Sequence, residues 1–485
     1  MADKFLASQV STADPWPVRL VGVVCSAAFR RPLLATLLLW AILFLPFAGT
    51  RSLYYEEGRY TLAALDMLAN GHWLRPEVLG LGFVEKPPAL FWLIGAASAL
   101  AGGPSEWAIR APAALATLLG ALLAAGAARR IAGPKAALVA AIAFMLSPFT
   151  FTKGVRAEPD LFVTVTSFAA FLLWLEVRRW SGRRSVAGWG AVLLLLSATA
   201  MFKGPQPLGY FGIGAGLVAL TERRWRELPA LMAVGVIAAG LPAAWAAVVY
   251  EPGDELTWRG QLRMAGWPEL SAYVGGTFRF IGESAAELMP WLALAVPALL
   301  PAWRRRVGLE DRLPRAMAFY AFGCTALLAF WPGALARYAT PASPAVAVLA
   351  GLAGAALWRT GPVRWRQALA ALLLVAIGVR LVWVAAIPFE TARNEASRRL
   401  ASELTAPIGA SRDPLLLLGP AIDYNAAFYM QQAGLAPRQI RTAKEIVAPA
   451  WLIGAGEPPP GGLKVEIAAD RKGFVYRLYR VLWTE

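Results

Sequence analysis

The chain is poor in cysteine and histidine. It has two cysteines, Cys25 and Cys324, and one histidine, His72. Two cysteines cannot build a metal framework, and we expect no disulfide between them, because one precedes the first long apolar run and the other lies inside a later one. We interpret His72 as a surface residue rather than a metal ligand. These scarcities exclude a disulfide scaffold and a cysteine-based metal site.

Charge is scarce as well. Charged residues make up 16% of the 485 residues, and hydrophobic residues make up 58%. That is more apolar surface than one soluble core can bury, so a membrane is the natural solvent for the excess. The net charge of +16 suggests nucleic-acid binding only if the basic residues gather on one soluble face. Here they interrupt hydrophobic runs, which is typical of a membrane protein, and we expect no nucleic-acid partner.

Long apolar runs dominate the first 389 residues. A hydrocarbon core of about 30 Å is crossed by about 20 apolar residues in a helix. The runs therefore predict an all-α polytopic membrane protein of about 11 to 13 transmembrane helices. The predicted crossings are Pro32–Gly49, Ala111–Ala128, Ala136–Phe151, Leu161–Val177, Ala187–Phe202, Pro207–Leu220, Leu228–Tyr250, Leu288–Trp303, Ala316–Trp331, Ala339–Trp358 and Gln367–Pro388.

Arginine marks alternate connections between these runs. Cytoplasmic loops carry the excess of Lys and Arg, so the basic connections and the N-terminus are expected in the cytoplasm. The run Pro88–Ala101 is too short to cross and would break the alternation, so we interpret it as an interfacial or re-entrant helix. The five basic connections contain Arg129, Arg130 and Lys135; Arg178, Arg179, Arg183 and Arg184; Arg223, Arg224 and Arg226; Arg304, Arg305, Arg306, Arg312 and Arg315; and Arg359, Arg364 and Arg366.

Two long loops and a tail then lie on the other, extracytoplasmic side. The loops are expected at about 50–110 and 251–287, within a transmembrane domain of residues 1–389. Residues 390–485 change composition and predict a small soluble α/β domain, with a polar helix near Thr391–Glu403, the apolar run "LLLLG", a helix at "YNAAFYMQQAG" and strands at "WLIGA", "KVEIA" and "FVYRLYRVLW". The region before Arg31 lacks the pattern of a cleavable signal peptide, so Pro32–Gly49 is expected to be a retained first helix.

Acidic residues begin the first of these loops, in "YYEEGRY" at 54–60. One interpretation is a solvated loop in which Glu56 or Glu57 pairs weakly with Arg59. The other is a carboxylate partly desolvated by tyrosines, which acts as a general base or binds a cation. Spacing alone does not choose between them.

Lone cations and carboxylates recur at other expected outer helix ends. In "GFVEKPPALFW", Lys86 either reaches to the lipid headgroups or holds a lipid phosphate. In "RAEPDLFVTVTSF", Glu158 and Asp160 stand where an unused charge is costly, although the helix N-terminus also favours a carboxylate. The segments "FKGP" at Lys203 and "ARYATPASP" at Arg337 repeat the pattern.

Six segments in this order resemble one family. The segments "YYEEGRY", "LGFVEKPPALFWL", "RAEPDLFVT", "FKGP", "LMPWLALAVP" and "ARYATPASP" are similar to those of the GT-C superfamily of membrane glycosyltransferases, in the branch of bacterial aminoarabinose transferases and protein O-mannosyltransferases. The resemblance implies transfer of a hexose or pentose from a polyprenyl phosphate to lipid A, another envelope glycan or a protein. It also implies inversion at the anomeric carbon and a site on the outer face of the bacterial inner membrane.

The resemblance also implies roles for particular residues. It makes Glu56 the catalytic carboxylate, with Glu57, Arg59 and Tyr60 flanking it, and Lys86 a phosphate ligand. The second acidic position falls on Asp160, or on Glu158 in a shifted alignment. Lys203, Arg337 and Arg59 are the further candidates for the donor phosphate, and Glu56 and Asp160 are the candidate ligands of a divalent cation.

Two departures from the family pattern affect the site. The family usually begins the first motif with "DE", whereas this chain has "EE", so the first carboxylate is one methylene longer. Some relatives carry a histidine in the loop that corresponds to 251–287, which has none here. Its role would pass to Arg259, Arg263 or Arg279.

A transporter or lipid flippase is the alternative class. Such proteins place ionisable residues in the middle of helices and often show internal repeats. The predicted helices here are nearly without such charges, and no repeat is evident. A non-catalytic envelope assembly protein is a third interpretation, but it leaves the charges at the outer helix ends unexplained.

Overall fold

The computed structural model describes residues 31–254, 268–309, 312–331, 334–409, 411–418, 422–454, 462–471 and 474–482. Contacts divide the chain into two compact units. Unit 1 contains Met1–Pro46, Glu85–Ala89 and Ala113–Ala385, and unit 2 contains Phe47–Val84, Leu90–Pro112 and Ala386–Glu485. The domain boundary predicted at residue 389 stays a prediction.

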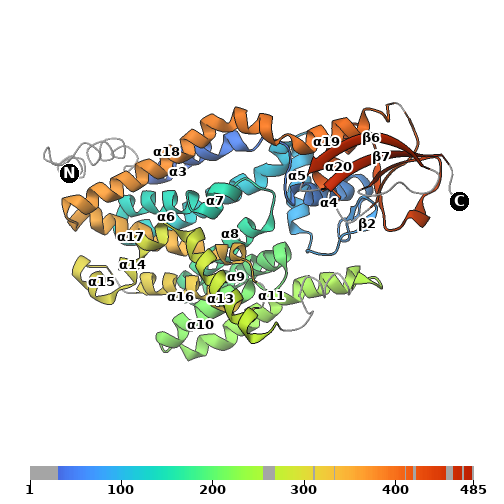
Figure 1. Ribbon diagram of the computed structural model, residues 1–485. Coiled ribbons are helices and arrows are strands. Elements are labelled where there is room, and N and C mark those ends of the chain that lie inside the picture. The colour runs from blue at the N-terminus through green and yellow to red at the C-terminus, as the bar shows by residue number, and fades with distance from the viewer. Residues whose placement is uncertain are drawn as a thin grey trace. The chain divides into compact units, whose positions relative to one another are not determined.

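Unit 1 is helical, as the apolar runs predict (Figure 1). In the described part of the chain, six helical segments are long and apolar enough to cross a membrane, and three shorter apolar segments accompany them. The polytopic fold class is therefore confirmed. The helices within or entering unit 1 are α3 (Pro32–Phe44), α6 (Glu106–Met145), α7 (Pro148–Lys153), α8 (Pro159–Val177), α9 (Gly182–Lys203), α10 (Leu208–Thr221), α11 (Leu228–Val249), α13 (Leu270–Leu288), α14 (Trp291–Leu299), α15 (Pro301–Val307), α16 (Arg312–Ala329), η3 (Ala336–Ala342), α17 (Ser343–Thr360) and α18 (Val363–Asn394).

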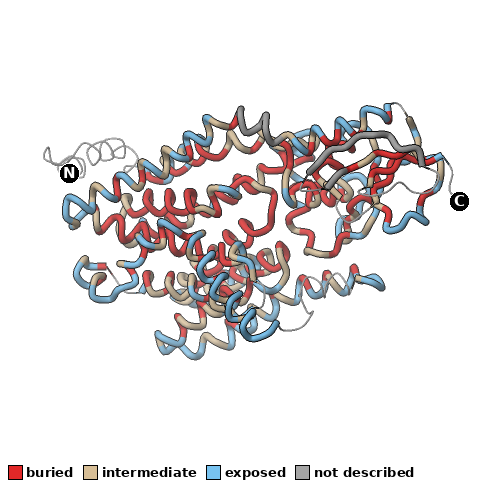
Figure 2. Tube along the Cα trace, viewed as in Figure 1, coloured by how far each residue is buried: buried red, intermediate tan, exposed pale blue. Residues whose placement is uncertain are grey.

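The core of unit 1 forms around α17. Nearly all of its residues are buried, which Figure 2 shows together with the buried positions of α6 and α8. Small residues of α17 permit close approach: a Cβ on Gly351 would lie 2.6 Å from the carbonyl oxygen of Ala136. At the edge of the unit, α18 runs alongside α3, and the buried Arg380 Nε donates to the carbonyl oxygen of Leu43 at 2.9 Å.

A glycine separates two of the predicted crossings, and prolines divide another. Gly133, at φ 78° and ψ −167°, interrupts α6, which contains the predicted crossing at Ala111–Ala128 and much of the one at Ala136–Phe151. The single helix predicted at Leu288–Trp303 is wrong, because α14 begins after Pro290 and α15 begins at Pro301. Proline has no N–H to continue a helix, so each one starts a new helix instead.

The predicted loop at 251–287 is also partly wrong. Its second half is α13, whose polar residues had suggested a loop. The candidate histidine substitutes Arg259 and Arg263 lie outside the described residues. Arg279 lies on α13, where its Nε is 3.4 Å from Oε1 of Glu283 and both side chains are largely exposed.

Unit 2 is built around a five-stranded sheet of order β4-β3-β5-β7-β6. The first three of these strands are parallel, and β7 pairs antiparallel with both β5 and β6. Strands predicted from "WLIGA", "KVEIA" and "FVYRLYRVLW" are present, and the apolar run "LLLLG" forms β3. Strand β4 was missed, because a short edge strand that begins with proline gives little signal. The elements are α4 (Glu57–Asn70), β1 (Glu77–Val78), β2 (Leu81–Gly82), α5 (Ala89–Leu100), α19 (Ala396–Thr405), β3 (Leu415–Leu418), α20 (Tyr424–Gln432), β4 (Pro437–Ile440), β5 (Ala450–Gly454), β6 (Gly462–Arg471) and β7 (Phe474–Val481).

The first predicted loop belongs to the same compact unit as this sheet. The amide of Gln439 on β4 donates to the carbonyl oxygen of Leu79, which joins the β1–β2 hairpin to the sheet edge at 2.8 Å. Helix α20 packs against α4. The "YYEEGRY" segment leads into α4, which begins at Glu57. Since α20 packs against α4, residues from the C-terminal part of the chain hold this segment.

Candidate active site

Glu56 stands immediately before α4 and is accessible to solvent. Its Oε2 accepts a hydrogen bond from Nη2 of Arg59 at 2.5 Å, and 43% of its side chain is exposed. Tyr55, just before it, has a positive φ of 55°, a conformation that costs a non-glycine residue energy and is found most often at functional sites. The geometry thus presents one reachable carboxylate beside one cation.

Glu57 has the opposite environment. Its side chain is fully buried, and Arg110 holds it in a two-point ion pair, with Nε to Oε1 at 2.8 Å and Nη2 to Oε2 at 2.7 Å. The remaining donors of Arg110 bond to the carbonyl oxygens of Ala48, Arg51 and Ser52. All five N–H groups of this buried guanidinium are therefore used to fix the chain that leads into the site.

Helix α20 fixes the same segment from the C-terminal part of the chain. Asn425 Oδ1 accepts from the amide of Gly58 at 2.8 Å, and its Nδ2 donates to the carbonyl oxygen of Tyr55 at 3.1 Å. Asp423 caps α20 by accepting from two of its first backbone amides. The backbone on both sides of Glu56 is thus held by one asparagine.

Tyr429, one turn further along α20, adds a second attachment. Its hydroxyl accepts from the amide of Leu53 at 2.8 Å and donates to Oε1 of Glu106 at 2.9 Å, and Glu106 is also contacted by Arg398. Burial and the neighbouring Glu106 raise the pKa of the Tyr429 phenol well above its ordinary value. The phenol is therefore neutral and keeps its proton for the bond to Glu106.

Gly58→Ala is expected to misplace this segment. A Cβ at this position would lie 2.5 Å from the backbone nitrogen of Asn425, so α20 or α4 must shift. Misplacement by about 1 Å can cost 100-fold in rate, and we expect a loss of that order in the sugar transfer that the family resemblance implies, measured with purified protein. Gly95→Ala, where the nearest atom is at an ordinary 3.6 Å, is the matched control. Wild-type transfer by Gly58→Ala would show that α20 does not position the loop.

Unit 1 holds a second group of charged residues, at the start of α8. Asp160 forms an ion pair with Lys203 at the end of α9, and both side chains are nearly buried. Glu158 Oε2 accepts from Nζ of Lys153 at 2.9 Å, and its Oε1 lies 3.7 Å from Nη1 of Arg156. Both acidic residues that the sequence singled out are therefore already paired with cations.

The segment η3 packs against α8, beside this group of charged residues. Lys203 Nζ lies 4.0 Å from the centre of the Tyr338 ring, and the neighbouring Arg337 interacts electrostatically with Asp160. Arg337 itself is exposed. Lys86 is half-buried in the short segment Glu85–Ala89, which also belongs to unit 1. Of the predicted site residues, the structure brings together Asp160, Lys203 and Arg337 in unit 1, and Glu56 with Arg59 in unit 2.

Two buried arginines were missed by the sequence analysis. Arg110 is the partner of Glu57, and Arg380 lies in the middle of α18, where its Nη1 donates to the carbonyl oxygen of Phe151 at 2.6 Å. The predicted crossing Gln367–Pro388 therefore contains a charged residue, Arg380, that the sequence analysis did not consider. A single arginine inside an apolar run is a usable signal, because such a charge persists only when backbone or acidic groups satisfy it.

His72 has a partner as well. Its Nδ1 lies 2.9 Å from Oδ2 of Asp66, and with Glu77 these residues form a group that has the donor atoms for a metal. Asp66 Oδ2 also accepts from the amide of Glu77 at 2.6 Å, and Oδ1 accepts from Asn70. These hydrogen bonds close the turn that ends α4, and this explains why the three side chains lie together.

Known proteins are similar to this chain in sequence and in fold. Residues 85–247 match the family described as dolichyl-phosphate-mannose-protein mannosyltransferase, and this range includes Lys86, Asp160 and Lys203. The chain is 30% identical over 304 residues to an undecaprenyl phosphate-alpha-4-amino-4-deoxy-L-arabinose arabinosyl transferase of Edwardsiella ictaluri, covering 61% of this chain and 54% of that one. It is also 30% identical over 352 residues to the protein of the same name from Pseudomonas paraeruginosa, covering 69% and 61%.

The chain therefore spans little more than half of the length of these curated relatives. A solved structure extends the comparison of folds: ArnT from Cupriavidus metallidurans, crystallised with undecaprenyl phosphate, superposes with a TM-score of 0.70 at 18% identity over 92% of this chain and 97% of that one. Sequence similarity to these transferases and the fold shared with ArnT thus bear out the resemblance to GT-C membrane glycosyltransferases of the aminoarabinose transferase branch.

Proposed function

We propose that this protein transfers a sugar from a polyprenyl-phosphate donor to an acceptor of the bacterial cell envelope. The observation that carries the proposal is the fold shared over 92% of the chain with a protein crystallised with undecaprenyl phosphate. The curated relatives, which are named for sugar transfer from that carrier, agree with it. Because the relatives are transferases, we do not retain the transporter alternative.

The sugar is proposed to be 4-amino-4-deoxy-L-arabinose, a pentose, and the acceptor lipid A. The sugar follows from the names of the relatives, and the acceptor from the branch that the chain resembles. Orientation is proposed from the arginines: the N-terminus and the basic connections lie in the cytoplasm, and the candidate site and the C-terminal sheet lie in the periplasm. Residues 1–389 and 390–485 remain our proposed domains.

The proposed reaction requires the protein mainly to supply positive charge and to orient the acceptor. A sugar phosphate has a good leaving group, so the site must stabilise the phosphate and aim the acceptor at the anomeric carbon from the opposite face. Lys86 and Arg337 are proposed to contact the donor phosphate directly. Lys203 is bound to Asp160, so we propose that this pair sets the local charge rather than holding phosphate alone.

Glu56 is the proposed carboxylate for the acceptor. If the acceptor is a hydroxyl, Glu56 takes its proton; if it is a phosphate, which is already ionised, Glu56 and Arg59 orient it. Glu57 is proposed to position the segment through Arg110, without contact to substrate. Glu56 and Asp160 are each paired with a basic side chain, so they do not fit a divalent cation as they stand and we derive no step through one.

Mass spectrometry of lipid A and other envelope glycans, from cells with and without the gene, tests the proposal. We expect one aminoarabinose-modified species to disappear with the gene and to return with the wild-type copy. Purified protein must also move the sugar from undecaprenyl phosphate to lipid A. Unchanged lipid A together with a changed envelope glycan or protein would refute the proposed acceptor, and vesicle transport without transfer would refute the function.

A further inference from the structure

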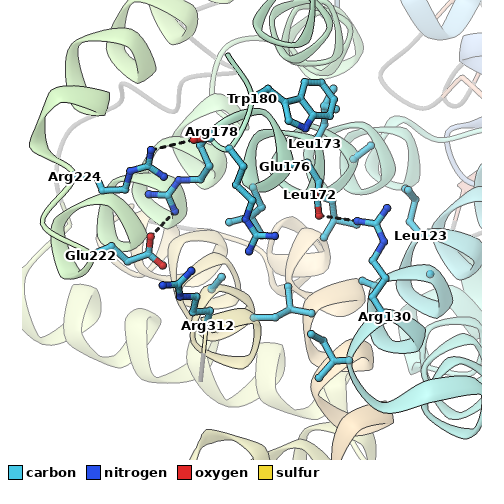
Figure 3. Close-up of a pocket in the computed structure, with 18 of the residues that line it drawn as sticks. Leu123, Arg130, Leu172, Leu173, Glu176, Arg178, Trp180, Glu222, Arg224 and Arg312 are labelled. Atoms are coloured by element: carbon cyan, nitrogen blue, oxygen red, sulfur yellow. Dashed lines mark hydrogen bonds and ion pairs between the residues drawn. The ribbon is translucent and has the colours of Figure 1, made fainter. Parts of the chain in front are cut away.

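A cavity lies at the other end of α8 from Asp160. Its volume is about 690 Å³, and its walls come from α6, the end of α8, the segment after α10 and the start of α16 (Figure 3). Asp160 and Arg178 are separated by 18 residues of chain, or about 27 Å along a helix. That is close to the thickness of a hydrocarbon core, so the cavity and the Asp160 group lie near opposite surfaces of the membrane.

The cavity has an excess of positive charge. Glu176 and Glu222 are the acidic residues of its lining, and Figure 3 shows their contacts with Arg130 and Arg178. The distances are 2.7 Å for Arg130 with Glu176 and 2.9 Å for Arg178 with Glu222. The arginines that line it are Arg130, Arg178, Arg179, Arg224 and Arg312. Glu227, just outside the lining, pairs with Arg178 and Arg224, so five cations face three anions and the excess is two.

Two of these arginines are available to a ligand. Arg179 and Arg312 are exposed, and neither has an acidic partner among the residues that the structure describes. Arg224, by contrast, pairs with Glu227 at 2.7 Å and donates to the carbonyl oxygen of Arg178 at 3.0 Å. The guanidinium fork matches a phosphate better than an ammonium does, so a phosphate is the anion that these two side chains favour.

The rest of the lining is hydrocarbon. Half-buried leucines of α6 and α8, among them Leu123, Leu172 and Leu173, form a wall beside the arginines (Figure 3). A small soluble anion gains nothing from such a wall. An amphipathic ligand gains from both parts, because its phosphate meets the arginines while its acyl chain covers the leucines.

We propose that this cavity binds the phosphate headgroup of an anionic phospholipid of the cytoplasmic leaflet. Arginine enrichment alone would scatter positive charge over separate loops, whereas here arginines from four of the five basic connections line one cavity. The proposal concerns lipid binding at the opposite membrane surface and does not depend on the transfer reaction. It adds a lipid site to a protein whose candidate active site lies elsewhere.

Native mass spectrometry of the delipidated full-length protein in detergent tests the proposal. Three probes are titrated: long-chain phosphatidylglycerol, phosphatidylcholine and inorganic phosphate. Replacing Arg179 and Arg312 together by glutamine is expected to weaken phosphatidylglycerol binding roughly 10- to 30-fold, since each basic residue near a headgroup contributes about one fivefold step. Phosphatidylcholine is expected to bind weakly to both proteins.

The matched control removes two charges from outside the cavity. Arg129→Gln with Arg183→Gln loses exposed arginines from two of the same basic connections, but neither lines the cavity, so phosphatidylglycerol affinity is expected to stay unchanged. An equal loss in both pairs would overturn the proposal in favour of diffuse attraction. Saturation by inorganic phosphate at lipid-like concentrations would overturn it in favour of a soluble anion. Leu173→Asn, which alters the wall and no charge, is expected to weaken lipid binding as well, and an unchanged affinity would contradict the acyl-chain contact.

Discussion

Glu56→Gln is expected to lower sugar transfer about 10²- to 10⁴-fold without lowering the melting temperature of the protein. The side chain is 43% exposed and pairs only weakly with Arg59 for stability, so its removal costs little folding free energy. The rate falls because glutamine can neither take a proton from a hydroxyl nor hold Arg59 through an ion pair as the carboxylate does. Transfer is measured with purified protein, undecaprenyl-phosphate aminoarabinose and lipid A.

Glu56→Asp is the informative companion variant. It restores the residue that the family usually carries and keeps the charge, so activity is expected to lie well above that of Glu56→Gln. If Glu56→Gln transferred sugar at the wild-type rate at equal protein concentration, Glu56 would not be the carboxylate of the reaction.

Arg110→Gln is expected to destabilise the protein severely. Removing one partner of a buried ion pair leaves an uncompensated charge, which costs about 3 to 5 kcal/mol in soluble proteins, and here it also removes bonds to three backbone carbonyls. We expect a large fall in the yield of monodisperse protein and in its melting temperature. Both are measured in detergent before any activity is assayed.

Two controls separate this effect from a general loss of charge. Arg398→Gln removes an arginine whose side chain is 43% exposed, and it is expected to cost less than about 1 kcal/mol. Glu57→Leu combined with Arg110→Met removes both buried charges and is expected to be more stable than Arg110→Gln alone. A wild-type melting temperature for Arg110→Gln would contradict the role of the pair.

The adjacent glutamates Glu56 and Glu57, one exposed and one buried, show where sequence reasoning stops. The resemblance separated Glu56 from Glu57 by position in a motif, but no pattern in the sequence indicated that Glu57 is fully buried. That follows from Arg110, 53 residues further along the chain. The pairing of Lys203 with Asp160, 43 residues apart, was likewise invisible, and it changes a candidate phosphate ligand into one member of an ion pair.

Helices were predicted well where hydropathy alone decides them. Predicted crossings such as Leu161–Val177 and Leu228–Tyr250 differ from α8 and α11 by one or two residues. The errors lie at Pro290 and Pro301, which break a run that is apolar throughout, and at α13, whose polar residues suggested a loop. Hydropathy predicts whether a segment lies in the membrane or in water, and it does not predict where the backbone of that segment bends.

The sequence by itself determined that this is a polytopic membrane protein and which short segments are the candidates for its chemistry, because composition and local order are enough for both. Only the tertiary structure decided which carboxylate is reachable, which cation is already paired and which arginines meet around one cavity. These are properties of side chains that approach from distant parts of the chain, and their energy depends on burial and partner distance. Such quantities have no counterpart in a linear pattern, so only the folded chain defines them.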